Sequence, residues 1–165
     1  MEDILTQSAL WIHYGTKPLV FWTTCVIILS LLVRKHLFRE AILIGISLLL
    51  TTSIVQVIKE WAEVPRADDA LVSLSSYAFP SGHAMASTFL LTTITWLIIQ
   101  NPSLAPRKYF VIGGLAVMVV VISASRIVIG VHTPLQVFGG MVIGSVVPLT
   151  CILIAHRKTT HHNTR

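Results

Sequence analysis

The sequence predicts an all-α integral membrane protein, a helical bundle of about five transmembrane helices with an N-terminal interfacial helix. Of the 165 residues, 54% are hydrophobic and only 12% are charged, and that charged fraction is about half the usual value for a soluble domain. Apolar runs close to the length that crosses a bilayer recur along the chain. Helices are the expected form because backbone groups in lipid must be satisfied internally. The length suits one domain, residues 1–165.

Five apolar runs are the candidate spans, at 18–33, 41–58, 84–99, 109–129 and 134–155. Segment 2–14 is short and mixes apolar with polar residues at near-helical spacing, so we expect it to lie at the membrane surface. Its acidic start argues against a cleaved signal peptide. Gly140-x3-Gly144 in the last run and Gly113-Gly114 in the fourth are expected to let helices of the same chain approach closely.

Lysine and arginine are divided unevenly between the two ends of these spans. With five spans, one side of the membrane receives Arg34, Lys35, Arg39, Arg107, Lys108, Arg157, Lys158 and Arg165. The other side receives Lys17, Lys59, Arg66 and Arg126. Because basic residues accumulate in cytoplasmic loops, we expect the second face to point outward, to the periplasm if the membrane is a bacterial inner membrane. This asymmetry also explains the net charge of +5 without a nucleic-acid partner.

Three polar clusters interrupt the apolar chain, and all fall on the predicted outer face. The first is Pro80-Ser81-Gly82-His83, a turn directly before the third span. The N–H groups at a helix start bind anions, Ser81 adds a hydroxyl, and His83 can exchange a proton near neutral pH. Taken alone, the cluster also fits a simple helix cap beside an interfacial histidine.

The second cluster is Lys59-x6-Arg66 and the third is Ser125-Arg126-x5-His132, and together they supply cations and another histidine. Lys59 and Arg66 open the longest loop, where they act either as topology-setting cations or as phosphate ligands, for which the planar fork of arginine is well suited. Arg126 lies inside an apolar run, where an ionisable residue marks function by default. His132 follows six residues later and can act as a nucleophile toward phosphorus.

The other histidines are expected to be solvated or interfacial, and they are His13, His36, His156, His161 and His162. With two cysteines and no paired carboxylates beside the histidines, the sequence predicts neither a metal site nor a cofactor. It also lacks a glycine-rich nucleotide loop.

In order and spacing, the three clusters resemble the type 2 phosphatidic acid phosphatase (PAP2) superfamily of membrane lipid phosphatases. The family pattern is K-x6-R-P, then P-S-G-H, then S-R-x5-H-x3-D, and the matching stretch runs from Lys59 to Gln136. The resemblance implies a metal-independent hydrolase of an outward-facing lipid phosphate or diphosphate. His132 would form a phosphohistidine and His83 would protonate the leaving oxygen. The implied phosphate ligands are Lys59, Arg66, Ser81, Gly82 and Arg126.

Three departures from the family pattern bear on this expectation. Gln136 stands where the family has a carboxylate beside the nucleophilic histidine, so the charge that would stabilise the imidazolium is missing. Asp68 or Asp69 could replace that charge. A substrate with a better leaving group would demand less of the nucleophile and so need the charge less. Ala67 follows Arg66 where the family has proline, and the bundle has about one span fewer than the family's usual six.

The residues leave the lipid and the reaction partly open. Undecaprenyl diphosphate, phosphatidic acid, phosphatidylglycerol phosphate and lipid A phosphates all fit the predicted site. Two other functions also fit the sequence. One is a catalytically weak relative that binds anionic lipids, which Gln136 favours. The other is a phosphotransferase that passes the phosphoryl group to a second lipid.

Overall fold

The computed structural model describes residues 2–66, 70–72, 74–101, 103 and 106–162, with side chains described between 4 and 156. Six helices account for most of these residues: α1 (Glu2–Gly15), α2 (Pro18–Arg34), α3 (Phe38–Ala62), α4 (Gly82–Ile99), α5 (Lys108–Val128) and α6 (Pro134–His162). The described part of the chain contains no β-strand. The predicted all-α class is therefore confirmed.

Four of these helices, α3 to α6, are each long and apolar enough to cross a membrane. The fifth span depends on α1 and α2, which meet at a 47° bend and satisfy the same test only as a pair. The prediction of about five spans is confirmed in this form. The segment expected at the membrane surface forms α1, and α3 and α6 extend beyond the predicted runs 41–58 and 134–155.

Helices α4 and α6 pack in close contact because α6 presents glycines to α4. A Cβ atom at Gly140 would collide with the carbonyl oxygen of Ser81, and one at Gly144 with that of Met85. The predicted close approach through Gly140-x3-Gly144 within one chain is thus confirmed. The same prediction for Gly113-Gly114 was wrong, because a Cβ atom at either glycine would meet no atom within 4 Å. This contact brings the beginnings of both helices together, and the backbone N–H of Ser81 donates to the carbonyl of Gln136 over 3.0 Å.

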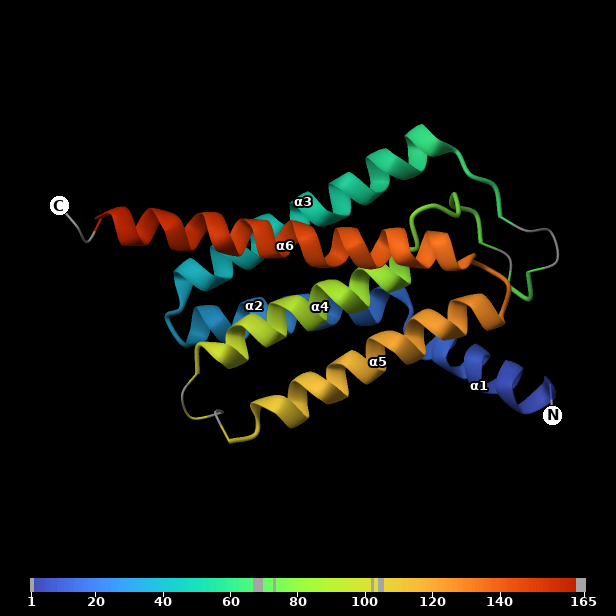
Figure 1. Ribbon diagram of the computed structural model, residues 1–165, viewed down its shortest axis with the longest axis horizontal. Helices are drawn as coiled ribbons and strands as arrows, with labels where there is room; N and C mark the ends of the chain where they lie inside the picture. Colours follow the sequence, from blue (N-terminus) through green and yellow to red (C-terminus); the bar gives the residue numbers. More distant parts are fainter. Residues whose placement is uncertain (1, 67–69, 73, 102, 104–105, 163–165) are drawn as a thin grey trace.

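One end of the bundle collects the three polar clusters. There α3 and α5 end, α4 and α6 begin, and α1 lies beside the end of α5 (Figure 1). Ala9 of α1 packs with Ile129 and Val131, which follow α5. The turns between α2 and α3 and between α4 and α5 lie at the opposite end (Figure 1). The basic residues of those two turns are therefore a bundle length away from the clusters.

Candidate active site

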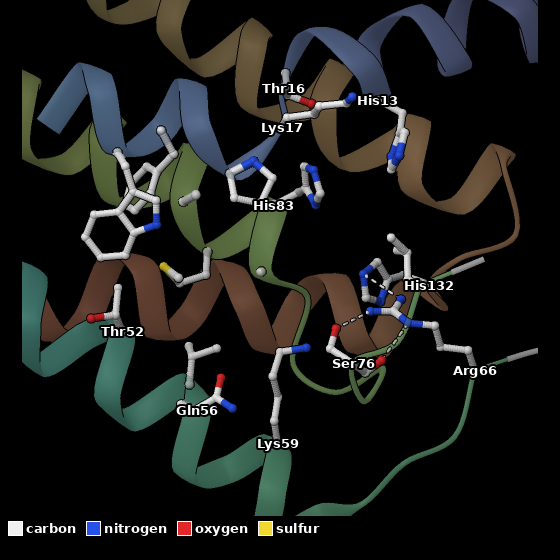
Figure 2. Close-up of a pocket in the computed structure, with 18 residues that line it drawn as sticks. His13, Thr16, Lys17, Thr52, Gln56, Lys59, Arg66, Ser76, His83 and His132 are labelled. Atoms are coloured by element: carbon white, nitrogen blue, oxygen red, sulfur yellow. Dashed lines mark hydrogen bonds between the residues drawn. The ribbon is translucent and has the colours of Figure 1, made fainter. Parts of the chain in front are cut away.

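A cavity of about 510 Å³ opens at this end of the bundle. Its wall is formed by helices α1 to α4, by the connection between α3 and α4, and by His132, which lies between α5 and α6. Its polar and charged lining includes His13, Lys59, Arg66, His83 and His132. Figure 2 shows these five side chains approaching one space from different elements. The apolar remainder includes Phe21, Trp22, Val55 and Met85.

His132 is held by Gln136 through a capping box at the start of α6. The side-chain oxygen of Gln136 lies 3.0 Å from the backbone nitrogen of Thr133 and 3.2 Å from Nδ1 of His132. In return, the Gln136 backbone N–H donates to the Thr133 hydroxyl over 3.4 Å, which completes the reciprocal pattern of such a box. A backbone N–H only donates, so it fixes the amide with its oxygen toward both partners.

The orientation of Gln136 determines the tautomer of His132. Because the amide oxygen accepts, Nδ1 of His132 carries the proton and Nε2 keeps its lone pair. Nε2 is the ring nitrogen that faces Arg66 and the cavity, with Nη1 of Arg66 at 3.4 Å. The amide therefore replaces one function of the family's carboxylate, orientation of the ring, but not the other, stabilisation of its positive charge.

Burial, the largest cause, and the positive charges of Arg66 and Lys59 together lower the pKa of His132 to about 4, although the hydrogen bond to Gln136 opposes the shift. Only 5% of the residue's surface is exposed. At neutral pH the imidazole is consequently uncharged, which is the form required of a nucleophile.

Arg66 and Lys59 are both bonded to main-chain carbonyls near the cavity. Arg66 donates to the carbonyls of Ser76, Tyr77 and Val131 and to the Ser76 hydroxyl. Lys59 is buried and donates to the Tyr77 carbonyl. The two cations therefore shape the connection between α3 and α4 as well as charging the cavity.

The start of α4 leaves polar atoms of two residues without partners, and of these two His83 lines the cavity whereas Ser81 does not. Ser81 precedes α4, and its hydroxyl is buried without a hydrogen bond in the described structure. Nε2 of His83 is buried and unpartnered in the same way. Such atoms are costly to bury unsatisfied, and they stand at a helix start, whose backbone N–H groups can bind an anion. Gly82, the first residue of α4, lines the cavity and has open space around it.

The family resemblance implied that Arg126 is a phosphate ligand, but Arg126 does not line this cavity. Its side chain is fully buried at the end of α5, where Nε and Nη2 donate to the Ser125 hydroxyl over 3.1 and 2.9 Å. Its Nη1 lies 2.7 Å from Nδ1 of His13. The guanidinium thus lies one side chain behind the cavity wall, with His13 in front of it.

The sequence analysis missed His13, which was expected to be solvated or interfacial but is only 6% exposed. The sequence held only a weak signal, because Ala9 and His13 are four residues apart and therefore share one face of a helix. Ser76 and the Tyr77 carbonyl were also missed, since no local pattern predicts which loop oxygens will meet Arg66. Asp68 and Asp69, considered as substitute carboxylates, lie outside the described residues.

Sequence comparison identifies relatives that cover part of the chain. Phosphatidylglycerophosphatase B of Bacillus subtilis is 37% identical over 91 residues, 54% of this chain and 45% of that protein. An undecaprenyl-diphosphatase of Sulfolobus acidocaldarius is 34% identical over 76 residues, 43% of this chain and 30% of that protein. The chain therefore spans less than half the length of the curated relatives it matches.

Two solved structures resemble the whole bundle. The crystal structure of a transmembrane PAP2-type phosphatidylglycerolphosphate phosphatase from Bacillus subtilis aligns with a TM-score of 0.81 at 26% identity, over 93% of this chain and 77% of that one. Aquifex aeolicus LpxE aligns with a TM-score of 0.71 at 21% identity, over 90% and 86% of the two chains, and so shares the fold. The PAP2 superfamily model matches residues 40–160, which include every predicted site residue. The chain is a multi-pass membrane protein that belongs to the PAP2 superfamily.

Proposed function

We propose that the protein is a metal-independent lipid phosphate phosphatase that acts through a phosphohistidine on His132. The observation that carries this proposal is the state of His132, an uncharged imidazole whose Nε2 lone pair points into a cavity lined by cations. A binding site for anionic lipid would need the cations but not an oriented, neutral imidazole. This difference favours catalysis over the lipid-binding alternative.

The reaction has two steps, each with a place for its proton. In the first, Nε2 of His132 attacks phosphorus, the N–P bond forms, and the bond from phosphorus to the lipid oxygen breaks. His83 gives a proton to that leaving oxygen. In the second, His83 takes a proton from water as the water attacks phosphorus, the N–P bond breaks, and inorganic phosphate leaves. Lys59, Arg66 and the N–H groups at the start of α4 stabilise the charge on the transferring phosphoryl oxygens.

A second cavity supports a lipid as the substrate. It measures about 240 Å³, runs between α2, α4 and α5, and shares Thr16, Phe21, His83 and Ala86 with the first cavity. Most of its lining is apolar, including Val20, Leu90, Ile94, Leu115 and Met118. A phosphate in the first cavity and a hydrocarbon chain in the second would meet at His83, the proposed donor to the oxygen that joins them.

The substrate class follows from this division into a charged and an apolar cavity. We assign lipid mono- and diphosphates, with undecaprenyl diphosphate and phosphatidylglycerol phosphate as the first candidates, because relatives carry those names. Gln136 favours a diphosphate, whose phosphate leaving group demands less of the nucleophile than an alcohol does. We place the site on the outer face of a bacterial inner membrane, since the basic turns lie at the opposite end of the bundle.

The decisive experiment is phosphate release by the purified protein in detergent, with and without EDTA. The panel contains undecaprenyl diphosphate, phosphatidylglycerol phosphate and phosphatidic acid. His132→Asn should reduce release to background while retaining a side-chain N–H near Gln136, and radiolabelled substrate should leave an acid-labile label only on the wild type. His36→Asn is the matched control, because His36 is exposed at the far end of the bundle. Unchanged turnover in His132→Asn, or loss of activity with EDTA, would contradict the proposal.

A further inference from the structure

We propose that His13 of α1 is a positioning residue that holds the charge of Arg126 directly behind the wall of the phosphate cavity, where that charge raises the affinity for phosphate. The inference rests on the proposed function, because it assigns a role within the same site. It starts from the 2.7 Å contact between Nδ1 of His13 and Nη1 of Arg126, a buried pair joined across 113 residues. No polar cluster of the predicted site includes any part of α1.

The contact determines the protonation of His13. A guanidinium only donates, so Nδ1 of His13 must accept and cannot carry a proton. The neutral ring then carries its proton on Nε2. The ring of His13 lies 5.8 Å from that of His83, centroid to centroid, and both line the cavity. His13 therefore stands between Arg126 and the cavity, with a donor nitrogen remaining.

The same contact defines how Arg126 is presented. Ser125 accepts from Nε and Nη2, and His13 accepts from Nη1. A guanidinium has five N–H groups, so these three bonds leave two without an acceptor among the described side chains. Ser125 precedes Arg126 in the same helix and cannot by itself fix the plane of the group. His13 is the second anchor, and it comes from another helix.

Anchoring α1 on α5 does not require a histidine at position 13. Ala9 and Leu10 already pack against Ile129 and Val131 beside the end of α5. A buried polar ring is costly unless it is hydrogen-bonded, and an apolar side chain would pack at the same place without that cost. The bond to Arg126 is what distinguishes histidine here from a packing residue.

The test uses two substitutions of similar size that differ in one acceptor. Asn places an amide oxygen close to the position of Nδ1, whereas Leu fills the space without an acceptor. Affinity for inorganic phosphate is measured by calorimetry on the full-length protein in detergent. We expect His13→Asn to stay within about 3-fold of wild type and His13→Leu to lose about 10- to 100-fold, the range for a charge-assisted hydrogen bond. Equal effects of the two substitutions would overturn the proposal.

Two further measurements separate positioning from a purely structural role. If His13 acts through Arg126, adding His13→Leu to Arg126→Lys should weaken phosphate binding by less than about 3-fold, because residues in one network are not additive. Full additivity would refute the assignment. Nitrogen NMR of wild-type protein with labelled histidine should show the His13 proton on Nε2. A proton on Nδ1 would contradict the contact, and this measurement needs no variant to fold.

These readouts are independent of turnover. Phosphate affinity and the His13 tautomer can be measured on a protein that hydrolyses no lipid at all. If every lipid phosphate fails as a substrate, the proposed function is wrong while the positioning role of His13 stands or falls on its own data. His36→Asn again provides the control for a histidine substitution remote from the cavity.

Discussion

The side-chain oxygen of Gln136 lies 3.2 Å from Nδ1 of His132. The same oxygen accepts from the Thr133 backbone, so the amide cannot turn its NH2 group toward the imidazole without losing a helix-capping bond. An amide that turned its NH2 group toward Nδ1 would favour the other tautomer of His132, and this is a concern that any amide at this position raises. The capping box removes that concern and leaves the missing charge as the remaining difference from the family pattern.

The first prediction concerns this missing charge. Gln136→Glu keeps the side-chain length that reaches Nδ1 and adds a carboxylate, which should stabilise the imidazolium formed during attack. We expect kcat to rise about 10-fold or more, within the roughly 10⁴-fold that an acid-to-amide change costs a serine-protease triad. Gln136→Met is the control that removes the acceptor and should lower kcat. A fall in kcat for Gln136→Glu would mean that the site depends on the amide.

The second prediction concerns the titration of His132. Its pKa of about 4 should appear in an NMR titration of labelled histidine, assigned by loss of the signal in His132→Asn. Because the charge of Arg66 repels a proton on the ring, Arg66→Gln should raise this pKa toward the ordinary value near 6.5. A fold that disfavours the protonated ring loses stability as the pH falls from about 6.5 toward 4. An unchanged pKa in Arg66→Gln would show that burial alone sets it.

The third prediction concerns the contact between α4 and α6. Gly140→Ala should lower the free energy of unfolding by about 1–3 kcal/mol, because the new methyl group overlaps the Ser81 carbonyl. Gly45→Ala in α3 has open space around it and should leave stability unchanged or raise it by up to about 1 kcal/mol. Thermal unfolding in detergent compares the two. Equal stabilities would show that the helices can separate without cost.

The fourth prediction concerns the apolar cavity. Met118→Trp should raise KM for a long-chain lipid phosphate and leave a short-chain, soluble phosphate monoester unaffected, because Met118 lines that cavity and the phosphate site is separate. The control is Val117→Trp, whose side chain is as exposed as that of Met118 but lies outside the lining. An equal rise in KM for both substrates would place the hydrocarbon chain elsewhere.

The fifth prediction concerns orientation. After Cys25 and Cys151 are replaced by Ala, a cysteine at exposed Ser75 should react with an impermeant thiol reagent added to intact cells. Ser103, exposed between α4 and α5 at the other end, provides the matched Ser→Cys variant and should be protected. The reverse pattern of labelling would turn the site toward the cytoplasm.

Much of the fold could be predicted because lipid imposes a simple rule on sequence. Runs such as 109–129 are long and apolar, and charge asymmetry places their ends on two sides without knowledge of packing. The motifs between Lys59 and His132 likewise named residues that line one cavity, namely Lys59, Arg66, Gly82, His83 and His132. Helix geometry alone, however, cannot show that His13, from a different helix, meets Arg126. That contact depends on how α1 folds back along α5, which is a tertiary property.

The position of Arg126 shows the same limit from the other direction. We expected an arginine inside an apolar run to mark function, and the structure buries its side chain fully behind the cavity wall. The Thr133–Gln136 box, by contrast, was visible in the sequence as Thr-Pro-Leu-Gln and could have been found. The comparison of Gln136 with the family's carboxylate draws attention to the missing charge and away from this capping role.

The bonds of Arg66 have a consequence for how the protein would take up an anion. Its five N–H groups face five acceptors: the carbonyls of Ser76, Tyr77 and Val131, the Ser76 hydroxyl and the His132 ring. A phosphate that binds Arg66 must therefore displace oxygens that hold the connection between α3 and α4. Binding of the anion and ordering of this segment by Arg66 therefore compete, so a change in one equilibrium changes the other. The N–H groups of Arg66 would bind the loop oxygens in the empty site and the phosphate oxygens of the substrate in the occupied site.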